Sequence, residues 1–101
     1  MKDDSKKNLV TEEKLDKYIK TTKKALKKAE ICVPKKTHFY KIAKDIKKMA
    51  KDYLNDSEYF KKQGDYIRSF GAINYAHGWL DSGARQGYFD VDNDNKLFTV
   101  D

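Results

Sequence analysis

The chain begins with a polar stretch, and apolar residues then recur at the spacing of an amphipathic α-helix. From Leu15 to Ala29 they fall three or four positions apart, which marks one buried stripe on a helix whose remaining arc is rich in lysine. Thr11 is a favourable N-cap at the start of this pattern, and Pro34 disfavours helical geometry in the residue before it. The pattern therefore predicts a first helix over residues 11–31.

Two further helical patterns follow, over residues 37–62 and 65–86. The break between them is short, because Gly64 suits the left-handed position that ends a helix and Asp65 can cap the next one. A turn of this length makes the two helices antiparallel neighbours.

The third predicted helix differs from the others because it contains no lysine and carries two apolar stripes side by side. Two stripes require two packing partners. An antiparallel three-helix bundle supplies both partners, and this is our interpretation. The alternative is that part of the apolar surface, through Tyr75 and Trp79, forms a homodimer interface.

The last residues read as two β-prone runs, 88–91 and 96–100, around a turn-prone tetrad. We therefore predict an all-α fold, a spectrin-repeat-like antiparallel three-helix bundle with a short C-terminal β-hairpin or extended tail. The predicted division is a flexible leader over 1–10, the bundle over 11–87, and a tail over 88–101 that packs on the bundle.

Composition narrows the class of protein. The chain has 101 residues with a net charge of +6, which splits into +10 over residues 1–51 and −4 over residues 52–101. Its single cysteine, Cys32, excludes an internal disulfide and a multi-cysteine zinc site. No apolar run is long enough to span a membrane, so we expect a cytoplasmic protein without membrane partners.

Candidate chemistry is sparse. His77, Asp81 and Arg85 fall at i, i+4 and i+8 on one helical face, either as a structural network or as a polar binding site. Without a nucleophile, a phosphate-binding loop or enough metal ligands, they specify no reaction, and we predict no enzyme, metal or cofactor. Asp90, Asp92 and Asp94 mimic part of a calcium loop, but that loop's usual glycine and final glutamate are missing.

One block of residues in the third predicted helix resembles the sequence of a known protein family. Tyr75-Ala76-His77-Gly78-Trp79-Leu80-Asp81, after the turn at Gln63-Gly64-Asp65, resembles the archaeal domain-of-unknown-function family 357 over about residues 12–101. The resemblance implies an archaeal cytosolic three-helix bundle and no assigned activity. A weaker similarity, from Tyr59 to Ala76, is to one helical hairpin of a tetratricopeptide repeat, although no second copy follows.

Two function classes stay open. The first is a non-enzymatic protein-interaction module that docks another protein, or a second copy of itself, through candidate residues on the third helix or through the tail. The alternative is weak, nonspecific binding to nucleic acid by the lysine-rich face of the first two helices. The candidate residues of that basic face are Lys20, Lys24, Lys27, Lys44 and Lys48.

Overall fold

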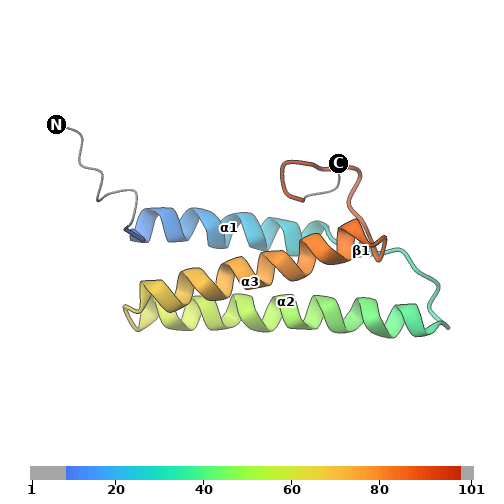
Figure 1. Ribbon diagram of the computed structural model, residues 1–101, viewed down its shortest axis with the longest axis horizontal. Helices are drawn as coiled ribbons and strands as arrows, with labels where there is room; N and C mark the ends of the chain where they lie inside the picture. The colour runs from blue at the N-terminus through green and yellow to red at the C-terminus, as the bar shows by residue number, and fades with distance from the viewer. Residues whose placement is uncertain (1–8, 99–101) are drawn as a thin grey trace.

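The computed structural model describes residues 9–98, which form three helices and one small sheet. α3 runs parallel to α1, and α2 runs antiparallel to both (Figure 1). An antiparallel three-helix bundle in an all-α chain is therefore confirmed. The elements in chain order are α1 (Glu12–Lys28), β1 (Glu30–Ile31), α2 (His38–Lys62), α3 (Tyr66–Arg85) and β2 (Phe89–Asp90).

The first helix starts where the sequence predicts and ends earlier than predicted. The Thr11 side chain caps α1 by accepting a hydrogen bond of 3.1 Å from the backbone N–H of Lys14. The helix stops at Lys28 because Ala29 turns to extended geometry, and the two residues after it form β1. β1 pairs with β2 in antiparallel register, so a tertiary contact overrides the local helical pattern.

The connection between α2 and α3 follows the predicted signals. Gly64 has a φ of +77°, the left-handed region that favours glycine, and the Asp65 carboxylate accepts from the backbone N–H of Arg68 at 3.1 Å. Close to this turn, Ser57 and Ser69 are fully buried between the helices. Each hydroxyl donates to the backbone carbonyl of the other residue, at 2.7 and 2.6 Å. The pair lets α2 and α3 approach closely without stranding a polar group.

The C-terminal segment is the extended tail of the two forms that we predicted. Its first β-prone run pairs with residues after α1, rather than with the second run. The hairpin prediction was therefore wrong over the described residues, because residues 95–97 form a turn instead of a second strand. Residues 99–101, the end of the second run, lie outside the described residues, as do residues 1–8 of the predicted leader. Val10, the last residue of that predicted leader, packs against the core.

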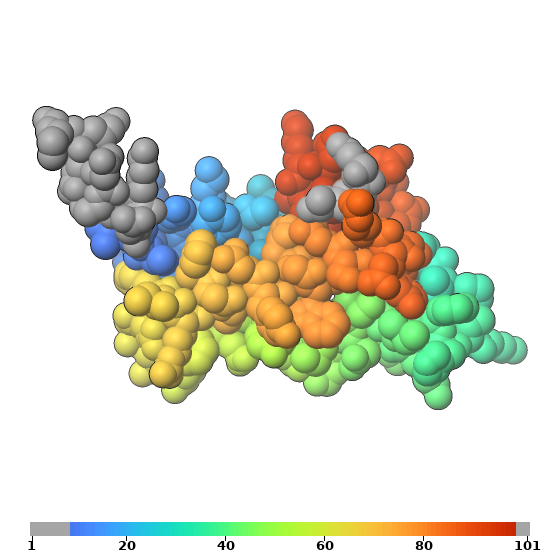
Figure 2. Space-filling model, viewed as in Figure 1, coloured from blue at the N-terminus to red at the C-terminus, as the bar shows by residue number. Residues whose placement is uncertain are grey.

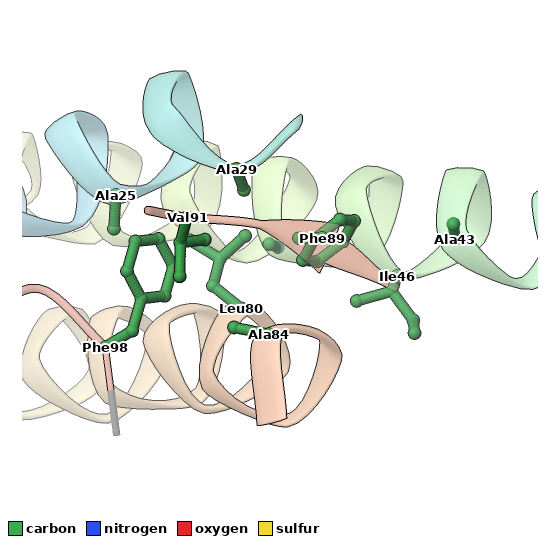
Figure 3. Packing of buried hydrophobic residues seen from close by; sticks show 10 residues of the cluster. Ala25, Ala29, Ala43, Ile46, Leu80, Ala84, Phe89, Val91 and Phe98 are labelled. Carbon is green, nitrogen blue, oxygen red and sulfur yellow. The ribbon is translucent and has the colours of Figure 1, made fainter. Parts of the chain in front are cut away.

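The core consists of two clusters along the bundle. One lies toward the α2–α3 turn and includes Leu15 and Ile73. The other joins all three helices to the tail, where Phe89, Val91 and Phe98 fit between α1 and α3 (Figure 3). α3 has the largest share of buried positions, six of 20, against five of 25 in α2 and four of 17 in α1. No helix among residues 9–98 is both long and apolar enough to cross a membrane.

Candidate functional site

His77 lies at the junction of α1, α3 and the tail. Its Nδ1 lies 3.0 Å from the Thr22 hydroxyl of α1, and its Nε2 lies 2.7 Å from the backbone carbonyl oxygen of Leu97 in the tail. A carbonyl only accepts, so the Nε2–H donates to Leu97 and the neutral ring accepts from Thr22 at Nδ1. Both ring nitrogens are therefore used to join three segments of the chain.

Asp81 does not form the hydrogen bond to His77 that helical spacing suggests. Its carboxylate lies 3.8 Å from His77 Nε2, beyond hydrogen-bond range, and the two groups form an ion pair only when the imidazole is protonated. Arg85 lies one turn further along α3 and is exposed. In this line of three residues, His77 therefore contacts other segments of the bundle, through Thr22 and Leu97.

The acidic residues of the tail shape its turns. The Asp90 carboxylate accepts from the backbone N–H of Asp92, and Asp94 accepts from the N–H groups of Lys96 and Leu97. A salt bridge of 3.0 Å joins Asp94 to Lys28 at the end of α1. Among the described residues, no three His, Cys, Asp or Glu side chains converge as a metal site would require.

We expect these contacts to make the stability of the tail depend on pH in the acid range. The backbone N–H of Leu97, then Lys28, lower the pKa of Asp94 below its usual value. Its contribution to stability is present above the pKa that it has in the unfolded chain, and it is lost as the pH falls through the lower pKa of the folded state. Between about pH 5 and pH 3 we expect the melting temperature of Asp94→Asn to fall less than that of the unchanged protein.

The matched control for this prediction is Asp56→Asn, which changes an exposed carboxylate on α2. Its melting temperature should follow that of the unchanged protein across the same pH range. Equal acid sensitivity of the Asp94 and Asp56 variants would show that the tail contact does not contribute.

Tyr75 and Trp79 form part of an aromatic row at the junction of α2 and α3. The Tyr75 ring meets Tyr53 of α2 edge to face, with centroids 4.5 Å apart, and Trp79 follows at 6.3 Å. Tyr75 remains 55% exposed, whereas the Trp79 indole N–H is buried with no acceptor among the described residues. Trp79 therefore contributes to packing, and Tyr75 keeps much of its ring at the surface.

The five predicted lysines of the basic face are all exposed, but they do not form one uniform patch. Lys44 and Lys48 line a groove between α1 and α2, where Lys44 also sits 5.9 Å from the centre of the Tyr40 ring. Lys20 lines the other half of that groove, among carboxylates. The sequence pattern identified the lysines and missed the groove, whose floor includes Leu26 and Ile31.

With this geometry established, comparison with protein-family models gives one match, to a family described as a protein of unknown function, over residues 17–89. The chain belongs to the DUF357 family. The match includes the three helices from Lys17 onward and the α3 block that carried the resemblance. The DUF357 description assigns no activity. No curated protein and no solved structure matches the chain.

Proposed function

We propose that this protein is a non-enzymatic protein-interaction module that associates with a second copy of itself through the exposed face of α3. That face forms much of the front surface in Figure 2. It contains no Asp, Glu, Lys or Arg between Ser69 and Leu80, in a chain in which 38% of residues are charged. The exposed residues of α3 are Ile67, Gly71, Asn74, Tyr75, Gly78 and Ser82, with Arg68 and Arg85 toward its two ends.

The observation that carries the proposal is open space at two exposed glycines. A Cβ added at Gly71 or at Gly78 would meet no atom within 4 Å, so neither glycine is needed to accommodate a neighbour within the monomer. Glycine inside a helix costs about 1 kcal/mol relative to alanine. Two such positions on a face without charged residues between Ser69 and Leu80 are suited to the close approach of another helix.

The order of residues on this face fits an isologous contact. A two-fold axis between Asn74 and Tyr75 would bring Gly71 of one copy opposite Gly78 of the other, because both glycines lie equally far from that axis along the helix. The same axis would bring the two Tyr75 rings together at the centre. Ile67, which is 80% exposed, would lie near Ser82 of the second copy and lose its contact with water.

Gly78→Leu tests this proposal because it separates dimerisation from folding. The new side chain enters open space in the monomer and improves helix propensity, so the melting temperature should be unchanged or higher. In the dimer it would hold the helices apart. Sedimentation equilibrium at micromolar protein and ~0.15 M salt should show a dimer for the unchanged protein and a monomer for the variant.

The matched control is Asn55→Leu, which adds the same side chain at an exposed position on α2. This variant should remain dimeric. A single 11.8 kDa species for the unchanged protein, or a dimer that persists in Gly78→Leu, would refute self-association through α3.

A further inference from the structure

A second surface lies in the groove between α1 and α2. One half of the groove is a hollow of about 460 Å³ whose lining comes from α1, β1 and α2, with no contribution from α3. Leu26 and Ile31 are its apolar members, and both are partly buried against the core. The polar lining consists of Lys44, Lys47, Lys48 and Lys51.

The charge of this half of the groove is strongly one-sided. Residues 20–51 contain 12 lysines and only two acidic residues, Glu30 and Asp45. The Lys47 ammonium donates to the backbone carbonyl of Ala29 at 2.7 Å, which places a positive charge at the end of α1. Lys48 pairs with Asp52 on its own helix, so the ion pair does not close the groove.

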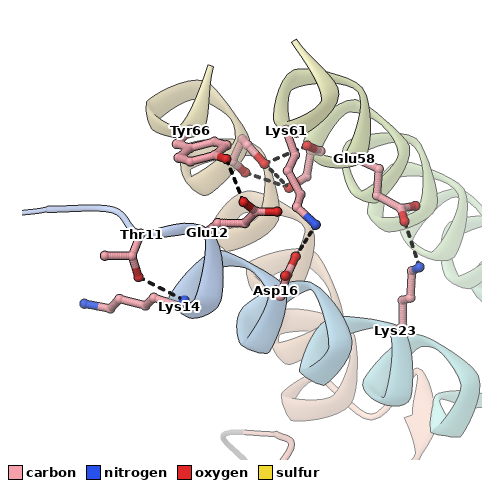
Figure 4. Close-up of polar contacts among 10 residues, drawn as sticks. Thr11, Glu12, Lys14, Asp16, Lys23, Glu58, Lys61 and Tyr66 are labelled. Carbon is pink, nitrogen blue, oxygen red and sulfur yellow. Dashed lines mark hydrogen bonds and ion pairs between the residues drawn. The ribbon is translucent and has the colours of Figure 1, made fainter. Parts of the chain in front are cut away.

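The other half of the groove is different because ion pairs cross it. Lys23 of α1 bonds to Glu58 of α2 at 2.7 Å, and Asp16 of α1 pairs with Lys61 of α2 (Figure 4). The pairing with Asp16 raises the pKa of Lys61. Acidic residues of the protein itself therefore balance the lysines there, and only the half near the α1–α2 connection presents an excess of positive charge over an apolar floor.

We infer that this basic half of the groove binds an acidic amphipathic helix from a partner protein. The apolar side of such a helix would cover Leu26 and Ile31, and carboxylates beside that apolar side would reach the lysines. From Lys44 to Lys51 the α2 backbone rises roughly 10 Å, or two turns. Acidic residues at i, i+3 or i+4, and i+7 of the partner would match this row.

A nucleic acid would use these features less well. Phosphates pair with lysine ammonium groups but gain nothing from an apolar floor. The chain's two arginines, Arg68 and Arg85, belong to α3 and lie outside the groove, so the residue type best suited to bidentate phosphate recognition is missing from the lining. An acidic amphipathic helix would use both the lysine charges and the apolar floor of the groove, and it is therefore the partner that we propose.

The test measures binding of labelled probes to the full chain by fluorescence anisotropy. The first probe is a helical peptide of about 18 residues with leucines along one side and glutamates flanking them. The second has the same composition in scrambled order, which removes the apolar side and keeps the charge. The third is a short double-stranded DNA. The amphipathic peptide should bind about tenfold or more tightly than the scrambled one, and more tightly than DNA.

Two charge-reversal variants locate the site. Lys44→Glu/Lys51→Glu reverses two exposed lysines of the groove, and Lys14→Glu/Lys96→Glu reverses two exposed lysines outside it, so both change the net charge equally. The groove variant should bind the amphipathic peptide about tenfold or more weakly, and the control variant less than about threefold more weakly. Circular dichroism of both variants would verify that they remain folded.

Three results would overturn this inference: equal binding of the two peptides, tighter binding of DNA, or equal losses in the two variants. Peptide binding by the groove can be tested independently of self-association through α3. The groove variant should still form the dimer, and Gly78→Leu should still bind the amphipathic peptide. Failure of one surface therefore leaves the evidence for the other intact.

Discussion

Leu80→Ala is expected to lower the free energy of unfolding by about 2–5 kcal/mol. Leu80 is 0% exposed and lies in the cluster where α3 packs against α1, α2 and the tail. Shortening it removes apolar contacts and leaves a cavity among small neighbours such as Ala25 and Ala84, which cannot move in to fill it. Urea denaturation followed by circular dichroism would measure the loss.

Leu9→Ala provides the matched control, because it makes the same chemical change at a leucine that is 54% exposed. Its effect should stay within about 0.5 kcal/mol. A similar loss in the two variants would mean that Leu80 is not at the centre of the core.

Gly83→Ala is the second large effect that we expect, with a loss of about 1–3 kcal/mol. A Cβ at this position would lie 2.3 Å from Cε2 of Phe89 and 2.8 Å from its Cδ2, far inside van der Waals contact. The ring cannot move freely because it is only 3% exposed and belongs to β2, which pairs with β1. The gain in helix propensity, about 1 kcal/mol, offsets part of this cost.

A double-mutant cycle isolates the clash at Gly83. Phe89→Leu shortens the side chain that the new Cβ would meet, so adding Gly83→Ala to this variant should cost less than it costs in the unchanged protein. Strict additivity in urea denaturation would contradict the proposed clash, and a more stable Gly83→Ala protein would do so as well.

Local signals predicted the bounds of the second and third helices well. The first helix ends earlier than predicted because of a contact with a segment far away in the chain. Caps, a glycine in left-handed geometry and the helical spacing of apolar residues act over a few positions, so they can be read from the sequence. The end of α1 depends on the pairing of β1 with β2, and α2 and α3 separate these two strands along the chain. Periodicity cannot reveal this pairing, and for the same reason it could not show which partner the tail would choose.

The candidate sites were predictable only as residue types. The sequence placed His77 in a line with Asp81 and Arg85, but its hydrogen-bond partners, Thr22 and Leu97, come from other elements. The roles of the glycines were also hidden: of the three inside α3, only Gly83 lies where an added Cβ would meet a neighbour within the monomer. The lysines of α1 and α2 were evident, whereas the groove required the relative placement of the two helices.

The short turn at Gly64 also bears on the order in which the chain folds. α2 and α3 come together by closing a very small loop, and the reciprocal bonds of Ser57 and Ser69 form beside it. α1 instead joins through Thr22 to His77 and through Lys28 to Asp94, contacts between residues far apart in the chain. Such contacts cost more loop-closure entropy, so the α2–α3 hairpin should assemble early. α1 and the tail should then pack against this hairpin in one step, because each of them covers part of the same core cluster.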